Sequence, residues 1–426
     1  MKLLKEVENR FQGLTFHTVK TDKYKTNTLI LKLKAPLKRE FVTLRALLPY
    51  VLQSGTKTYP SSTQLRTYLD DLYGATLHVD LSKKGEEHII TIRIEVANET
   101  FLSDPTPLFT KAIDLLADIL LSPALQNDIF VEETVEKEKR TLKQRIQSVY
   151  DDKMRYSNLR LVQEMCANEP YSLHVNGEME EIDRITAQSL FEYYKQVIME
   201  DQIDLYVIGN VNEDEVLNAA QKSFQLQNRQ EPRYEAPVSK KVTNVNEVIE
   251  EQDVKQGKLN IGYRTNTTYR DNDYYALQVF NGIFGGFSHS KLFLNVREKE
   301  SLAYYAASRF ESHKGILMVM SGVEFKNYER AVSIIKEQMD AMKKGDFTDQ
   351  EVSQTKAVIR NQVLETIDTA RGLAEILYHN VVSDKKRPMS EWIEGINAVT
   401  KEEIISVAQK VELDTIYFLK GLEADK

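Results

Sequence analysis

The sequence contains one cysteine in 426 residues, which excludes an internal disulfide bond and a cysteine-based metal site. Cys166 could serve as a nucleophile, but no neighbour in the sequence would activate it, so an inert buried thiol is favoured. Charged residues interrupt the first eight positions, and no run of about 18 apolar residues occurs. We therefore expect no signal peptide, no membrane span and a location in the reducing cytoplasm.

Histidine is also sparse. Its seven positions are His17, His78, His88, His174, His289, His313 and His379. No two of them lie three to five residues apart, so no helical zinc-binding pair can form. The chain likewise lacks the GxSxG elbow of serine hydrolases and a phosphate-binding P-loop. Each histidine is therefore expected to be structural or solvated, and this chain is expected to bind no metal or other cofactor.

Basic residues are not in excess. The net charge of −8 gives no support to nucleic-acid binding. With 42% hydrophobic and 28% charged residues, the composition is typical of a soluble globular protein. An acidic cluster on a predicted helix favours a solvated helix face over a binding site; its members are Glu132, Glu133, Glu136 and Glu138. The length exceeds what one hydrophobic core organises, which predicts two or more domains.

Apolar periodicity predicts one order of elements twice. The first half has predicted strands at 14–19, 28–33, 76–81, 88–96 and 204–209, with helices at 44–52, 61–72, 106–121, 128–167 and 186–199. The second half has predicted strands at 259–263, 303–308, 316–323 and 415–419, with helices at 273–284, 290–297, 328–344, 348–369, 389–397 and 401–409. Ala75 and Ala303 stand at equivalent places in the two strand pairs, 228 residues apart.

This repetition predicts an α+β fold made of two duplicated domains, each a mixed or antiparallel sheet with helices on one face. The polar segment 228–247, which carries Pro232 and Pro237, is the predicted linker. The domains are accordingly predicted at 1–227 and 248–426.

The most informative stretch runs from Ser288 to Tyr304, where a predicted helix passes into a strand. Arg297 and Tyr304 could be an ordinary salt-bridging arginine and a half-buried tyrosine, or a pair that holds a peptide backbone. The preceding Gly285 and Gly286 lack the spacing of a phosphate cradle, so a helix end with a flexible loop is favoured.

Three segments carry a family resemblance that extends over nearly the whole chain. They are Gly13-Leu14-Thr15 with its strand, EPYSLHVNG from Glu169 to Gly177, and GFSHSKLFLNVREKESLAY from Gly286 to Tyr304. Together they resemble the M16B branch of the pitrilysin-type zinc peptidases, which includes the mitochondrial processing peptidase. The resemblance implies two domains of the LuxS/MPP-like metallohydrolase type. Within the family, the sequence resembles the non-catalytic YmfF type of Gram-positive bacteria.

The family's zinc site is absent from the matching positions. An inverted HxxEH motif supplies two zinc ligands and a general base, and a downstream glutamate is the third ligand. Here the ligand positions are Ala46 and Tyr50, the base position is Pro49, and the third-ligand position is Arg145. Only Glu138, which matches an accessory acid, is retained. The resemblance therefore implies that this chain alone does not hydrolyse peptides.

Arg297 and Tyr304, by contrast, match the arginine and tyrosine that the family uses to bind the substrate backbone and stabilise the oxyanion. In two-chain members, one subunit supplies zinc and the other supplies this pair. The resemblance thus implies an HxxEH-bearing M16B homologue as heterodimer partner, zinc in that partner, and a peptide substrate. We expect both side chains to line an internal cavity, with Gly285, Gly286 and Ser288 in a loop that admits substrate.

Two alternatives remain at this stage. The protein could be a non-enzymatic binding or scaffold protein of the same fold, in which Arg297 and Tyr304 serve packing only. It could also be an independent peptidase with a different metal site. The sequence names neither the substrate nor the pathway.

Overall fold

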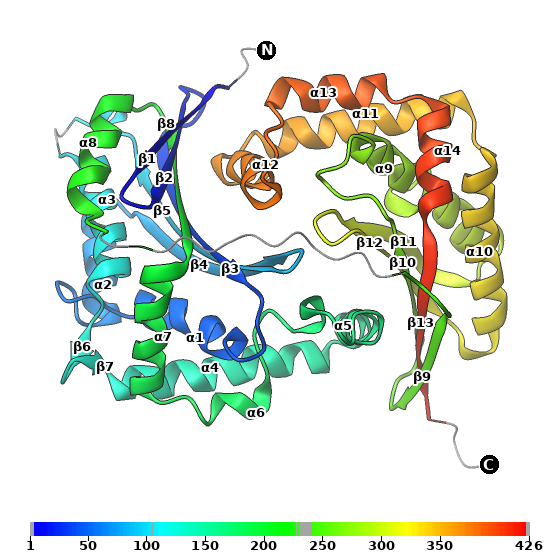
Figure 1. Ribbon diagram of the computed structural model, residues 1–426, viewed down its shortest axis with the longest axis horizontal. Coiled ribbons are helices and arrows are strands. Elements are labelled where there is room, and N and C mark those ends of the chain that lie inside the picture. The colour runs from blue at the N-terminus through cyan, green and yellow to red at the C-terminus, as the bar shows by residue number, and fades with distance from the viewer. Residues whose placement is uncertain (1–3, 104–105, 227–228, 230–240, 423–426) are drawn as a thin grey trace.

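The structure is a computed structural model that describes residues 4–103, 106–226, 229 and 241–422. Figure 1 shows two sheets in opposite halves of the molecule, each backed on its outer side by helices. The amino-terminal half begins with β1 (Glu6–Phe11), and the carboxy-terminal half ends with β13 (Glu412–Gly421).

The first sheet has six strands in the order β1-β2-β8-β3-β5-β4. The remaining bounds are β2 Leu14–Lys20, β3 Thr26–Pro36, β4 Thr76–Lys84, β5 Glu87–Ala97 and β8 Gln202–Gly209. Only the pairing of β2 with β8 is parallel. Strand β1 escapes sequence-based prediction because charged Glu6, Glu8 and Arg10 alternate with its other residues, as suits an exposed sheet edge.

The second sheet has five strands in the order β11-β12-β10-β13-β9. Their bounds are β9 Asn246–Gln252, β10 Gly257–Arg264, β11 Ala303–Glu311 and β12 Ile316–Val323. Reversed, this order matches β2-β8-β3-β5-β4, and the β9–β13 pair is parallel like β2–β8. The duplication is thus visible in the topology, and the predicted fold class is confirmed.

Each sheet packs its own half's helices on one face through alternate side chains. Leu29, Leu31 and Leu33 of β3 enter the core with the first-half helices, whereas Ile30 points to the opposite face. The first-half helices are α1 Val42–Gln53, α2 Ser62–Asp71, α3 Leu108–Leu121, α4 Glu132–Asp151, α5 Lys153–Met165, α6 Met179–Ile182, α7 Ala187–Glu200 and α8 Glu213–Ser223. Short elements complete this half: 3₁₀ turns Glu99–Phe101 and Pro170–Ser172, and a small ribbon of β6 (Leu125–Gln126) and β7 (Ile129–Phe130).

The second half contains α9 Tyr274–Asn281, α10 Tyr328–Lys344, α11 Asp349–Thr366, α12 Ala370–Ser383, α13 Met389–Ala398 and α14 Lys401–Lys410. A 3₁₀ turn at Phe325–Asn327 precedes α10. Two segments between α9 and β11, η3 (Gly282–Gly286) and η4 (Phe293–Lys299), are π-helical.

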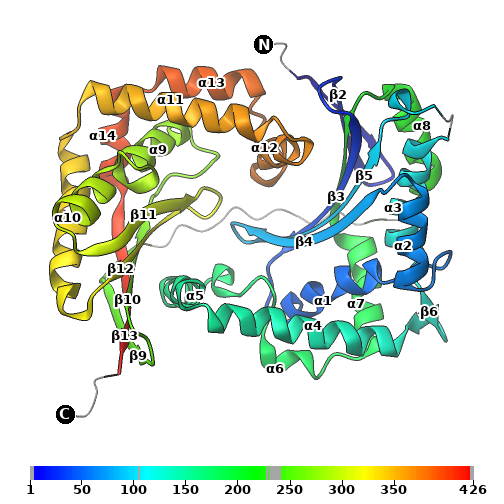
Figure 2. The same cartoon turned by 180° about the vertical axis from the view of Figure 1, so that it is seen from behind.

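One helix of each half packs against the sheet of the other half. Helix α5 packs against β10 and β13 of the second sheet, and α12 packs against β3 and β8 of the first (Figure 2). The predicted single helix 128–167 is therefore wrong: the chain breaks at Asp152, whose carboxylate caps α5 by accepting from the backbone N–H groups of Met154 and Arg155. That break lets α5 leave its own half and cover the other sheet.

The two equivalent hairpin turns also meet between the halves. The backbone N–H of Gly85, in the β4–β5 turn, donates to Glu311 Oε1 at 3.3 Å. Lys314, in the β11–β12 turn, forms an ion pair with Glu86 at 2.5 Å. Long-range contacts of this kind tie the duplicated units into one body.

The predicted linker at 228–247 falls largely outside the described residues, which exclude 227–228 and 230–240. Strand β9 begins at Asn246, within the predicted linker. The domain limits at 227 and 248 remain predictions. Among the described residues, no helix combines the length and apolarity that crossing a bilayer requires.

Candidate functional site

Helix α1 carries the positions predicted to have lost the zinc ligands. Ala46 has no exposed surface, and Pro49 is buried inside the helix. Tyr50, the next residue, is only partly buried. The α1 face that would present metal ligands therefore offers a methyl group, a proline ring and a phenol.

Arg145 of α4 lies directly against Tyr50. Its guanidinium carbon is 3.4 Å from the centre of the Tyr50 ring, and its Nη1 is buried without a hydrogen-bond partner. Burial raises the pKa of the Tyr50 phenol, which the positive charge of Arg145 opposes. A cation–π pair thus joins the predicted second- and third-ligand positions.

Glu138, the retained acid, precedes Arg145 on α4 and is 8% exposed. Its Oε1 accepts from the Ser54 hydroxyl at 3.3 Å and lies 3.5 Å from the Lys137 ammonium. The carboxylate is therefore engaged in linking α4 to the end of α1.

These residues do not fit a zinc ion. Ala46 and Pro49 have no donor atom, and the Arg145 cation would repel a divalent ion. Within the described residues, no group of three or more His, Cys, Asp or Glu side chains is arranged to hold a metal. The positions predicted to match the family's zinc site therefore supply no side-chain ligand for the ion.

Arg297 lies on the π-helical segment η4. Its side chain is 43% exposed, its Nε is 3.6 Å from Glu298 Oε1, and its guanidinium carbon is 4.6 Å from the Phe293 ring centre. Both contacts come from its own segment, so the donors on the far side of the guanidinium face outward. Short π-helical segments occur frequently at functional sites.

Tyr304 is the extra residue of a β-bulge. Ala303 pairs with Val323 and Tyr305 pairs with Gly322, which leaves Tyr304 without a partner on β12. Bulges redirect a side chain away from the regular pleat. The side chain of Tyr304 is 81% exposed, so the expectation that this chain encloses it in an internal cavity is wrong.

The glycines before η4 are packed tightly. Gly285 is buried, and a Cβ there would lie 2.5 Å from Ser308 Oγ and 2.8 Å from Ser308 N. Gly286 and Ser288 are exposed. The predicted substrate loop therefore has a fixed start at Gly285 and an accessible part at Gly286 and Ser288.

Sequence inspection missed a buried ionic cluster that joins the halves. Glu169 Oε1 accepts from Arg264 at 2.6 Å, and its Oε2 accepts from Lys314 at 2.5 Å. Arg264 also pairs with Asp414 at 2.8 Å. Burial by itself raises the pKa of Glu169, but these cations hold it below its ordinary value. The one available signal was Glu169, an acid at the position where the resembling family has a histidine.

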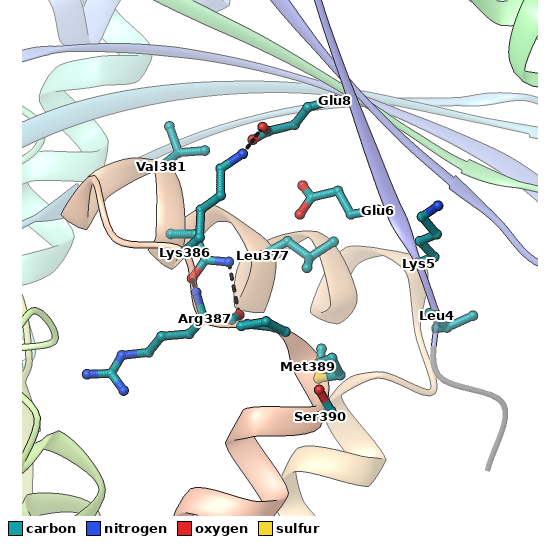
Figure 3. A pocket seen from close by; sticks show the side chains of 12 residues that line it. Leu4, Lys5, Glu6, Glu8, Leu377, Val381, Lys386, Arg387, Met389 and Ser390 are labelled. Atoms are coloured by element: carbon teal, nitrogen blue, oxygen red, sulfur yellow. Dashed lines mark hydrogen bonds and ion pairs between the residues drawn. The ribbon is translucent and has the colours of Figure 1, made fainter.

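A pocket of about 570 Å³ lies between β1 and the connection from α12 to α13 (Figure 3). Glu8 and Lys386 form an ion pair across it, and Glu6 contacts the buried His17 at 2.8 Å. The Arg387 guanidinium points away and donates to Tyr269 O and Asp271 O. Because its principal charges are already paired, this pocket presents no ready catalytic group.

Comparison with known proteins agrees with this geometry. Residues 184–359 match the family model described as the peptidase M16 inactive domain. The chain is 58% identical over 423 residues to the "Probable inactive metalloprotease YmfF" of Bacillus subtilis, covering 99% of both chains. A conserved protein from Enterococcus faecalis superposes with a TM-score of 0.92 at 35% identity, covering 99% of this chain and all of that one.

A protease from Helicobacter pylori shares the fold at 16% identity, with a TM-score of 0.82 over 98% of this chain and all of that chain. The 58% identity over nearly the whole chain, with the match to the family model, confirms the expected family resemblance. Since the α1 and α4 positions lack every zinc ligand, the likeness to inactive members also agrees with the chemistry. The chain belongs to the M16 peptidase family and is one of its inactive, metalloprotease-like members.

Proposed function

We propose that this chain is the catalytically incomplete subunit of a heterodimeric M16 peptidase. Its partner is an HxxEH-bearing homologue that holds zinc, and this chain presents Arg297 and Tyr304 to the bound peptide. The heterodimer works in the cytoplasm. This chain has a single, buried cysteine and so has no internal disulfide bond that would require an oxidising compartment.

The observation that carries the proposal is the contrast between two regions. The α1–α4 region is closed by the contact of Arg145 with Tyr50. Arg297 and Tyr304 are exposed at 43% and 81%, on a π-helical segment and a bulge. The Tyr304 phenol and the outward-facing Arg297 donors are therefore both accessible to a second molecule.

The chemistry of the pair suits an acyl-transfer transition state. A guanidinium offers several fixed donors and a phenol offers one more, so both stabilise an oxyanion that develops on a peptide carbonyl. The substrate peptide is proposed to lie extended, adding a strand to an exposed sheet edge. Exposed Gly286 and Ser288 border its path.

The test is to purify the chain together with an HxxEH-bearing homologue from the same organism and to measure peptide cleavage. We expect the mixture to cleave and each chain alone to be inactive. Arg297→Ala should lower kcat/KM about 10²–10³-fold, as removal of an oxyanion donor does elsewhere. Arg309→Ala, an exposed arginine on the same strand as Tyr304, is the matched control and should have little effect.

Two results would contradict the proposal. The first is full activity of the partner alone, and the second is an unchanged rate for Arg297→Ala in the mixture. Either would favour a scaffold protein of the same fold, in which the pair serves packing. Recovery of the chain from cells with an unrelated assembly, and not with a zinc-bearing homologue, would point the same way.

A further inference from the structure

A second pocket, of about 360 Å³, lies beside the outer edge of the first sheet. Residues of β4 and β5 form its floor, and Arg371 and Glu375 of α12, from the other half, form its wall. Strand β4 is the last strand of this sheet, pairing only with β5. The pocket therefore adjoins an unpaired strand edge at the junction of the two halves.

The pocket holds an arginine without a partner. Arg93 of β5 lies directly opposite His78 of β4, and neither side chain forms a hydrogen bond or ion pair within the described residues. Arg93 is only partly exposed, so its guanidinium is not fully hydrated by bulk water. A partly buried cation of this kind gains from a complementary anion.

The carboxylates that line the pocket are already neutralised. Glu375 of α12 pairs with Lys32 at 2.5 Å and with Lys84 at 3.3 Å. Asp80 of β4 pairs with Arg371 of α12 at 3.6 Å, at the exposed mouth of the pocket. Together with Arg93, these residues place four cations, Lys32, Lys84, Arg93 and Arg371, against two carboxylates, and Arg93 is the one of the four without a carboxylate partner among the described residues.

The alternation of β4 connects this charge to the strand edge. His78, Asp80 and Ser82 all line the pocket, because side chains two residues apart share one face of a strand. A peptide strand added to β4 would place alternate side chains on the same face, next to these residues. Arg93 and Arg371 lie within reach of a long acidic side chain in that position.

We propose that this pocket is a binding subsite for a glutamate or aspartate side chain of an extended peptide bound along β4. The inference rests on the proposed function in that it specifies the peptide, but it concerns this chain's own surface and involves neither zinc nor the partner. It assigns Arg93 and Arg371 the role of selecting acidic peptides.

The test measures binding of fluorescent peptides to the intact single chain by anisotropy. One Thr/Val-rich peptide carries glutamate at alternate positions, and its twin carries glutamine. We expect the glutamate peptide to bind about 5–10-fold more tightly at low salt, with the preference shrinking as salt screens the charges. Excess free glutamate should compete poorly, which separates a peptide subsite from a site for free carboxylates.

Three variants sharpen the result. Arg93→Gln should reduce the glutamate-over-glutamine preference to near unity while the glutamine peptide binds as before. Arg66→Gln removes an exposed arginine of α2 and should leave the preference intact. Asp80→Asn removes the carboxylate that competes for Arg371 and should increase the preference.

Equal binding of the two peptides, an unchanged preference in Arg93→Gln, or no binding of either peptide would overturn the inference. Equal competition by free glutamate would also overturn it. These outcomes are independent of the cleavage assay. A lost preference with an intact Arg297 effect removes only the subsite, whereas an inert Arg297→Ala with an intact preference removes only the proposed function.

Discussion

The guanidinium carbon of Arg145 lies 3.4 Å from the ring centre of Tyr50, and these two residues stand at positions predicted to match two zinc ligands of the family. A cation therefore occupies the region predicted to match the family's zinc site. The aromatic ring faces the guanidinium with its electron-rich side, so the charge remains stabilised without a carboxylate. A side-chain pair that would repel zinc thus also packs α4 against α1.

Arg145→Ala should lower the free energy of unfolding by about 1–2 kcal/mol, because a partly desolvated cation–π contact is lost. Urea denaturation of the purified chain measures this. Arg140→Ala, on an exposed position of the same helix, is the matched control and should change stability by less than about 0.5 kcal/mol. Equal effects of the two substitutions would contradict a specific Arg145–Tyr50 interaction.

Ser301, between Arg297 and Tyr304, adopts a left-handed backbone conformation with φ of 51°. This conformation costs a residue with a Cβ about 1–2 kcal/mol. Glycine avoids that cost, but it loses more backbone entropy on folding, which cancels part of the gain. Ser301→Gly should therefore raise the stability by about 0.5–1 kcal/mol, seen as an increase in Tm. Ser301→Ala keeps the strain and should give no gain; a gain in the alanine variant would refute the backbone argument.

Sequence reasoning predicted much of this molecule because its strongest signals are local or repeated. The strand pairs at Ala75 and Ala303 carry the same alternation, and their shared order predicted the duplicated fold. Matching α1 and α4 to the family placed Tyr50 and Arg145 at ligand positions, and the structure brings those two residues into contact. Their functional roles, like those of Arg297 and Tyr304, remain predictions.

The inter-half contacts were not predictable in the same way. Helix α5 covers the sheet of the other half, and its apolar face shows that it packs without showing against what. The Glu169–Arg264 pair joins residues 95 positions apart, which no periodicity reveals. The break at Asp152 did have a local signal, an acidic capping residue, but the surrounding helical periodicity concealed it.

Asp152→Ala should destabilise the protein by about 1 kcal/mol, because its carboxylate accepts from the N–H groups of Met154 and Arg155. In hydrogen exchange at low denaturant, the amide protons of α5 should lose more protection than those of α3, because the cap belongs to α5. Asp151→Ala removes the neighbouring carboxylate at the end of α4 and serves as the control. Equal protection changes in α3 and α5 would contradict a local capping role.

Mild acid should destabilise the folded protein through His313, in the β11–β12 turn. Its Nε2 lies 2.7 Å from Nδ1 of His379, and the two rings stack. Burial, with help from Lys84, lowers the pKa of His313 to about 3. Because this folded-state pKa lies below the unfolded value, stability is lost as pH falls from about 6.5, by about 2 kcal/mol near pH 5.

Urea unfolding across this range checks the acid effect. His313→Gln should remove about that much of the pH dependence, whereas His78→Gln, which replaces an exposed histidine, should remove little. Identical pH profiles for wild type and His313→Gln would show that His313 is not the titrating group.

His17 should produce the opposite dependence in alkali. Its ring lies between Asp204 at 3.2 Å and Glu6 at 2.8 Å and stacks on Tyr206. Burial by itself lowers the pKa of His17, but the two carboxylates overcome this and raise it to about 9. Since the folded-state pKa lies above the unfolded value, the stabilisation is complete below about pH 6.5 and is lost as pH rises through about 9.

The difference in unfolding free energy between wild type and His17→Gln isolates this contribution from lysines and tyrosines that titrate nearby. That difference should shrink by about 2 kcal/mol between about pH 7 and pH 10. Glu6→Gln should reduce the change, because one of the two carboxylates that hold the imidazolium is removed, while Asp204 continues to accept from the ring. A difference that stays constant across the range would mean that His17 is neutral in the folded protein, and that β1 is held by the Glu8–Lys386 pair and backbone pairing with β2 instead.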